Sequence, residues 1–113
     1  MAVNEQTITL NGLPVRLWRG GEGHEQTLLL LHGGVGGADL CWEPVLKSLA
    51  ESYQIIAPDL PGFGRTAALP VMRTQALLAW VDDLLTALSV EQVVMVGNSL
   101  GALLARLYAA THT

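Results

Sequence analysis

The apolar positions of this chain fall into short β-type runs and longer runs with helical spacing. Two β-type runs, residues 7–10 and 15–18, flank Asn11-Gly12, a dipeptide that favours a tight turn, so they predict an antiparallel hairpin. Residues 27–31 are almost wholly apolar and do not alternate with polar ones, which is typical of a strand buried on both faces. Two further short runs, residues 55–57 and 92–96, also predict strands.

Helical spacing predicts three helices, over residues 42–52, 75–88 and 100–111. Pro44 is expected in the first turn of the first helix, where its missing N–H costs little. Thr74 is placed to cap the second helix. The expected buried faces are Val45, Leu46 and Leu49 in the first helix, Leu77, Leu78, Val81, Leu84, Leu85 and Leu88 in the second, and Leu103, Leu104, Leu107 and Tyr108 in the third. Strands that alternate with helices in this way predict an α/β fold with a parallel sheet.

Asp82 and Asp83 are the carboxylate pair that a search for catalytic acids would find first. Neighbouring positions on a helix point about 100° apart, so the two side chains cannot share one site. We therefore interpret them as the solvated face of the second helix.

Ser99 stands where a predicted strand gives way to a predicted helix, in the sequence Gly97-Asn98-Ser99-Leu100-Gly101. A serine on so tight a strand-to-helix turn projects its hydroxyl from a strained backbone, and glycines two positions away allow strand and helix to approach closely. Ser99 is thus a candidate nucleophile, with Gly97 and Gly101 as supports of the turn. The alternative is a glycine-bounded turn that carries an incidental serine.

The glycine loop, residues 32–37, follows a buried strand, at the end where α/β folds bind ligands. An amide near Gly34, together with the amide of Leu100 at the helix start, could bind an oxyanion. A phosphate loop would need a Gly-Lys-Ser or Gly-Lys-Thr ending, which is absent from the sequence. A dinucleotide site needs Gly-x-Gly-x-x-Gly spacing, which the loop lacks, although Asp59 stands near the position of the acidic residue in such sites.

Composition narrows the classes of protein further. The chain has 113 residues, of which 50% are hydrophobic and 14% are charged, and this fits one domain. A net charge of −4 gives no basic field for nucleic acid or an anionic membrane. Cys41 is alone, so no internal disulfide can form, and the first ten residues do not resemble a signal peptide. We expect a cytoplasmic protein with a small-molecule substrate, no membrane span, no cofactor and no metal.

Three motifs together resemble the N-terminal half of an α/β-hydrolase. His32-Gly33-Gly34 is similar to the oxyanion loop of that family, residues 59–64 to its loop after the fourth strand, and residues 97–101 to its nucleophile elbow. Their order and spacing agree with the family over nearly all of the chain. The resemblance implies a partial α/β-hydrolase sheet, with an antiparallel hairpin, then parallel strands flanked by helices, and with the C-terminal strands missing. Residues 1–113 would form a single truncated domain.

The resemblance also assigns roles. Ser99 would be the nucleophile, Gly34 and Leu100 would supply the oxyanion amides, and Trp42 would lie near the substrate pocket. Asp59 would be structural and would order its own loop. Serine at the elbow is typical of esterases and carbon–carbon bond hydrolases, whereas haloalkane dehalogenases and epoxide hydrolases carry aspartate there. The predicted function is therefore hydrolysis of a small ester or a related acyl or carbon–carbon substrate.

The acid and the histidine that should follow the nucleophile in this family are missing from the chain. No acidic residue follows Ser99, and His112 would lie roughly 18 Å away at the far end of the last helix. His32 is expected to shape the glycine loop, and His24 to be solvated. The alternative function is that of a non-catalytic fragment or interaction protein, which pairs with itself or another chain through the exposed edge of the elbow strand.

Overall fold

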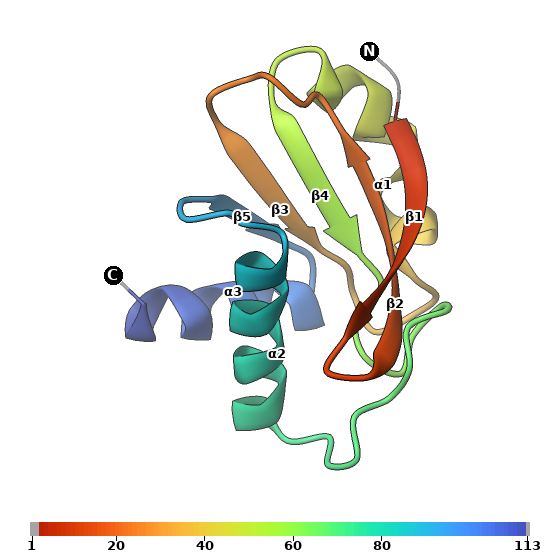
Figure 1. The fold of residues 1–113 in the computed structure, drawn as a ribbon, viewed down its shortest axis with the longest axis vertical. Helices are drawn as coiled ribbons and strands as arrows, with labels where there is room; N and C mark the ends of the chain where they lie inside the picture. The colour runs from red at the N-terminus through yellow and green to blue at the C-terminus, as the bar shows by residue number, and fades with distance from the viewer. Residues whose placement is uncertain (1–2, 113) are drawn as a thin grey trace.

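The computed structural model describes residues 3–112 as one five-stranded sheet flanked by helices (Figure 1). The strands lie in the order β1-β2-β4-β3-β5, and β5 is at an edge. The elements are β1 Val3–Leu10, β2 Leu13–Gly20, β3 Thr27–Leu31, α1 Ala38–Ala50, β4 Gln54–Pro58, α2 Thr74–Ala87, β5 Val94–Gly97 and α3 Leu100–Thr111. The α/β class is confirmed, and so is the arrangement of an antiparallel hairpin followed by parallel strands.

The N-terminal hairpin is confirmed and is longer than predicted. Strands β1 and β2 pair from Val3 opposite Gly20 to Leu10 opposite Leu13. Asn11 and Gly12 have φ of 51° and 82°, which is the left-handed backbone of a two-residue hairpin turn. Strand β2 then pairs antiparallel with β4, so the hairpin extends the parallel part of the sheet.

Strand β3 occupies the middle of the parallel part, between β4 and β5. All of its residues are buried, as the unbroken apolar run predicted. Its side chains alternate between two apolar clusters: Leu29 and Leu31 face one, and Leu28 and Leu30 face the other. The carboxyl ends of β3, β4 and β5 therefore open towards the same end of the sheet, where three loops leave it.

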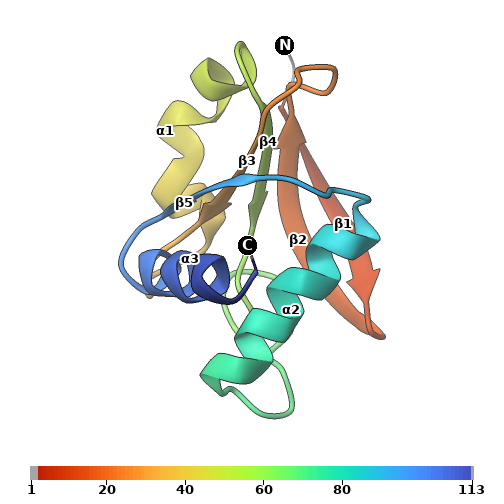
Figure 2. The same cartoon turned by 90° about the vertical axis from the view of Figure 1, so that its left-hand side faces the viewer.

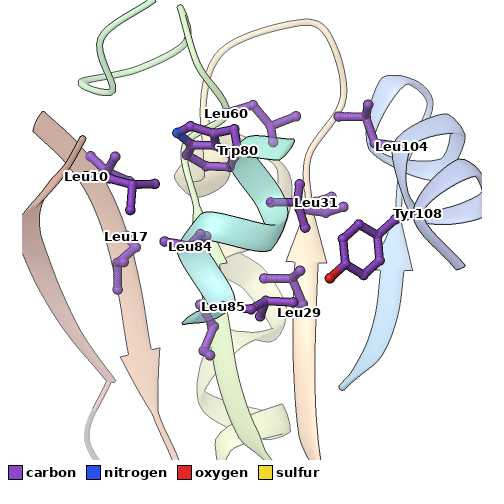
Figure 3. Packing of buried hydrophobic residues seen from close by; sticks show 13 residues of the cluster. Leu10, Leu17, Leu29, Leu31, Leu60, Trp80, Leu84, Leu85, Leu104 and Tyr108 are labelled. Atoms are coloured by element: carbon purple, nitrogen blue, oxygen red, sulfur yellow. The ribbon is translucent and has the colours of Figure 1, made fainter. Parts of the chain in front are cut away.

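Helices cover both faces of the sheet (Figure 2). Helix α1 packs on one face, where its Leu46 joins Ile55 and Ala57 of β4. Helices α2 and α3 pack on the other, and Figure 3 shows Trp80 of α2 and Tyr108 of α3 directed into the same cluster. Within residues 3–112 no helix has both the length and the apolar character that a membrane crossing requires.

The first predicted helix begins earlier than expected. Helix α1 begins at Ala38, so Pro44 lies inside it and not in its first turn. The glycine loop ends directly in the helix, and hydrophobic spacing could not reveal this because residues 38–41 include exposed and polar positions. Val45 was also misplaced: it is 41% exposed, and the buried residues of α1 are Ala38, Leu46 and Ala50.

Two predictions about the later helices are wrong. Thr74 does not cap α2: it is the first helical residue, Arg73 occupies the cap, and no side chain caps the helix. Leu103 does not lie on the buried face of α3, since it is 42% exposed while Leu104 is buried. The buried face predicted for α2 also omitted Trp80, which the structure shows to be only 5% exposed.

Candidate active site

Ser99 lies at the junction of β5 and α3 with a strained backbone. Its φ of 55° and ψ of −112° are outside the regions that residues with a side chain normally adopt, and such a conformation costs of order 1–3 kcal/mol. The Asn98 amide donates to the Leu31 carbonyl at 3.0 Å, and the Gly101 amide donates to the Asn98 carbonyl at 2.9 Å. The serine is exposed, so the turn presents its side chain to solvent.

The two elbow glycines are required by close backbone contacts. A Cβ on Gly97 would overlap the backbone of Gly101 and Ala102. A Cβ on Gly101 would overlap the Leu31 carbonyl and come within 2.8 Å of the His32 carbonyl oxygen. Helix α3 therefore begins in direct contact with the end of β3, which places the elbow against the glycine loop.

The glycine loop faces the elbow across this contact. A Cβ on Gly33 would lie 3.5 Å from the Cβ of Ser99, while one on Gly34 would meet nothing within 4 Å. Among residues 3–112 the amides of Gly34 and Leu100 donate to no protein acceptor. Leu100 is the first residue of α3, where the helix dipole favours negative charge. The structure brings the glycine loop and the elbow together, and the predicted oxyanion role of the two amides stays a prediction.

Asp59 is fully buried behind the glycine loop and accepts three hydrogen bonds. Its Oδ2 accepts from Arg16 Nε at 2.7 Å and from the Arg65 amide at 2.9 Å, and its Oδ1 accepts from the Ala38 amide at 2.7 Å. Burial alone would lower the pKa of Arg16, but the hydrogen bond and charge of Asp59, with the charges of Asp39 and Glu5, outweigh burial and raise it. The pair is therefore a buried ion pair with satisfied hydrogen bonds.

Sequence reasoning did not predict the partners of Asp59. It predicted that Asp59 would order its own loop, and the bond from Arg65 fits that role. The bonds from Arg16 of β2 and from Ala38, the first residue of α1, lie outside that loop. Arg16 stands between the apolar residues Val15 and Leu17 of β2, and this was a signal that a buried acid would face it.

His32 is fully buried, and its ring connects two loops. The Leu60 amide donates to His32 Nε2 at 2.8 Å, so the proton of the neutral ring lies on Nδ1, which is 2.5 Å from the Gly33 carbonyl oxygen. Phe63 meets the ring edge-on at a centroid separation of 5.2 Å. With both nitrogens engaged, His32 is not available as a base, and it shapes the loop as predicted.

The other two histidines lie away from the elbow. His112 ends α3, where its Nδ1 lies 3.1 Å from the Tyr108 carbonyl oxygen and its ring stacks on that of Tyr108. The prediction that His24 is a solvated side chain is wrong in part, because His24 is half-buried and its Nε2 is buried. Within residues 3–112, the side chain of no histidine is hydrogen-bonded to Ser99.

Trp42 lies on α1 and packs half-buried against the cluster around Leu46 and Ala57. Its predicted role at the substrate pocket stays a prediction. Its neighbour Cys41 is closer to the elbow, because Asn98 Nδ2 donates to Cys41 Sγ at 3.5 Å. The part of the chain that the structure describes has no group of three or more His, Cys, Asp or Glu side chains that could hold a metal ion.

These features match a known family. Residues 26–113 match the family model of the alpha/beta hydrolase fold, and the chain therefore belongs to the α/β-hydrolase family. It is 35% identical to a 2-hydroxy-6-oxo-6-(2'-aminophenyl)hexa-2,4-dienoic acid hydrolase of Metapseudomonas resinovorans, with 86% of this chain and 34% of that protein covered. It is also 35% identical to a pimeloyl-[acyl-carrier protein] methyl ester esterase of Aeromonas hydrophila, with 88% and 37% covered.

Solved structures agree with the family assignment. A serine hydrolase from the hydrocarbon-degrading bacterium Cycloclasticus zankles superposes with a TM-score of 0.86 at 31% identity, and the match covers 98% of this chain and 42% of that one. The chain thus spans about a third of the length of the two curated relatives, and it corresponds to part of the family's fold.

Proposed function

We propose that this chain supplies the nucleophile and the oxyanion site of a serine hydrolase that cleaves a small ester or a related acyl or carbon–carbon substrate. The observation that carries the proposal is the position of Ser99, exposed on a strained turn that packs against the glycine loop. A backbone strain of this kind persists only where surrounding contacts impose it, and it is concentrated at functional sites.

The proposed reaction is a double displacement. Ser99 Oγ loses its proton to a base and forms a bond to the carbonyl carbon, while the carbonyl π electrons move to oxygen. The resulting oxyanion accepts hydrogen bonds from the amides of Gly34 and Leu100. The intermediate then expels the leaving group, which takes the proton from the base, and leaves an acyl-enzyme. Water repeats the sequence on the ester bond and releases the acid and the free serine.

The base of this reaction would be a histidine outside residues 3–112, oriented by an acid that also lies outside. Two observations support this part of the proposal. His32 is occupied by Leu60 and Gly33, and His112 is bound at the end of α3. The curated relatives are about three times as long as the matched segment, which leaves room for both residues. None of the proposed steps requires a cofactor or a metal.

The choice of serine chemistry within the family rests on the elbow. A carboxylate nucleophile would form an alkyl-enzyme ester, whereas Ser99 forms an acyl-enzyme with carbonyl substrates. The two curated relatives and the solved structure described above have names that fit this chemistry: a dienoic acid hydrolase, a methyl ester esterase and a serine hydrolase. The first two favour carbonyl compounds as substrates, in one case on a carrier protein, and the three names do not single out one substrate for this chain.

A fluorophosphonate probe tests the nucleophile. The frame is read beyond the codon for Thr113, the encoded protein is purified, and labelling is located by mass spectrometry. We expect labelling at Ser99 and none in Ser99→Ala. Ser89→Ala is the matched control, because Ser89 is also an exposed serine with positive φ, at 58°. Labelling that persists in Ser99→Ala at the wild-type rate would refute the proposal.

A second candidate function is pairing with another polypeptide through β5. Strand β5 pairs only with β3 among the described residues, and its Val94 and Val96 are 43% and 37% exposed. An apolar strand with an unpaired edge is a template for another strand. Light scattering after size-exclusion chromatography of the 113-residue chain tests this. Val96→Lys should abolish any concentration-dependent association, whereas Val45→Lys, which changes an equally exposed valine on α1, should not. A strictly monomeric wild-type chain would exclude the pairing of two copies of this chain through β5.

A further inference from the structure

Both ends of the glycine loop are hydrogen-bonded to two consecutive residues of another loop. His32, at its start, accepts from the Leu60 amide at 2.8 Å. Ala38, directly after it, donates to Asp59 Oδ1 at 2.7 Å. All four residues are at most 1% exposed. The segment from Gly33 to Gly37 is thus held at each end by a buried hydrogen bond that water does not reach.

Asp59 is itself held in place. Arg16 Nε and the Arg65 amide fix its second oxygen. A Cβ on Gly37 or on Gly64 would overlap the Asp59 carboxylate, so both backbones pack directly on it. The carboxylate therefore cannot turn without moving β2, the Asp59 loop (residues 58–66) and the start of α1 together.

We propose that Asp59 is a positioning residue for the oxyanion site: through the Ala38 amide, and with the Leu60–His32 bond beside it, it fixes the Gly34 amide relative to Ser99. The inference rests on the proposed function, since it concerns the same amides. It differs from a role confined to the loop of Asp59, because it makes the position of Gly34 depend on a carboxylate that touches neither Gly34 nor Ser99.

We call the hydrogen bonds from Ala38 to Asp59 and from Leu60 to His32 the clamp. Amide exchange measured by NMR on the 113-residue chain tests the clamp without any catalysis. Asp59→Asn keeps the size of the side chain but turns an acceptor into a donor. We expect faster exchange at Ala38, and shifted resonances at Gly33 and Gly34. Asp39→Asn is the control, because it removes a partly exposed carboxylate from the same helix start and should leave both glycines unchanged. Changes in Asp59→Asn confined to residues 58–66 would overturn the proposal.

Ala38→Pro removes the same hydrogen bond from the other side and covers the case in which Asp59→Asn does not fold. Proline is favoured at the first position of a helix, and Gly37 already has an extended backbone, φ −123° and ψ −164°, and not the helical one that a following proline disfavours. The bonds of Asp59 to Arg16 and Arg65 remain available in this variant. We expect displaced Gly33 and Gly34 resonances again, and unchanged ones would overturn the clamp.

The rate of fluorophosphonate labelling of the protein that the gene encodes separates the two proposals. Asp59→Asn and Ala38→Pro should slow labelling between about 10-fold and 100-fold, since a misplacement near 1 Å has effects of that size. Asp39→Asn should label at the wild-type rate. If Ser99→Ala is not labelled while both clamp variants are labelled at the wild-type rate, the clamp is wrong and Ser99 remains the proposed nucleophile. If Ser99→Ala labels normally, the proposed function itself fails.

Discussion

The carboxyl ends of β3 and β4 differ from the edge strand β5 in how completely their polar and apolar groups are covered or paired. At the carboxyl ends of β3 and β4 the buried polar side chains all have partners: His32 binds Leu60, Asp59 binds Arg16, and Thr66 Oγ1 accepts from the Arg16 amide at 3.0 Å. Along β5 the outward valines are exposed. An open hollow of about 1040 Å³ lies there, lined by residues that include Val94, Met95 and Tyr108.

This difference shows which part of the architecture the chain completes by itself. The loop region that carries the candidate oxyanion amides is held by hydrogen bonds and ion pairs within residues 3–112. The β5 edge has unpaired backbone groups and apolar side chains on which further polypeptide could pack. We therefore expect substitutions that break these hydrogen bonds or ion pairs to cost far more stability than substitutions at the β5 edge.

The largest loss is expected from Asp59→Ala. It leaves the Arg16 guanidinium, which is 11% exposed, without its nearest carboxylate, and it also leaves the Ala38 and Arg65 amides unpaired. Breaking a buried pair in this way costs about 3 to 5 kcal/mol. Urea unfolding followed by circular dichroism measures the loss. Asp83→Ala, which removes an exposed carboxylate that accepts a hydrogen bond from Asn11, should have little effect. Equal losses in the two variants would contradict the comparison.

A somewhat smaller loss is expected from Gly101→Ala, at the contact between the elbow and β3. The new methyl would overlap the Leu31 carbonyl, and forcing an atom into such a space costs about 3 kcal/mol. The matched control is Gly34→Ala, whose methyl would meet nothing within 4 Å and should change stability by less than about 0.5 kcal/mol. If both alanines cost the same, the close contact of α3 with β3 is not real.

Ser99→Gly should stabilise the chain. Glycine adopts a φ of 55° without steric cost, so about 1 kcal/mol of the strain at the elbow is released. Differential scanning calorimetry should show a higher Tm. Ser99→Ala is the comparison, because it removes the hydroxyl and keeps the Cβ, and it should not stabilise. A Tm that falls in Ser99→Gly would mean that the turn is not strained.

The smallest effect is expected on the β5 side, at the hydrogen bond from Tyr108 OH to Asp82 Oδ1, 2.8 Å long. Burial, together with the hydrogen bond and charge of Asp82, raises the pKa of Tyr108 from 10.0 to about 12. Since the folded pKa is the higher one, this stabilisation is complete below pH 10 and is lost between pH 10 and about 12. The free energy of unfolding should fall more steeply there in wild type than in Tyr108→Phe. Parallel curves would contradict the raised pKa.

Much of the fold could be predicted from sequence because its signals are local. The bounds of β3 and α3 came from an apolar run and from helical spacing, and the structure has the same bounds. Gly97 also followed from local chemistry, since it removes a Cβ from a contact with the backbone of Gly101 and Ala102. Periodicity and turn chemistry act within a few residues, and for these elements they decided the outcome.

What could not be predicted depends on contacts between distant residues. Helix α1 begins at Ala38 because Asp59, 21 positions away in sequence, accepts its amide. The cap predicted at Thr74 failed because α2 already includes Thr74 and Arg73 takes the cap position. Leu103 is hydrophobic in a helical stripe, yet it is exposed because none of the described residues covers that face of α3. These outcomes depend on contacts between residues far apart in the sequence, which the local hydrophobic pattern does not encode.

A crystal structure of the encoded protein after reaction with a fluorophosphonate tests the central claim most directly, because the phosphonyl oxygen occupies the place of the oxyanion. We predict a bond from Ser99 Oγ to phosphorus, with that oxygen about 2.7–3.1 Å from both the Gly34 and the Leu100 amide nitrogens. Phosphorus on another residue, or an oxygen turned away from both amides, would contradict the account.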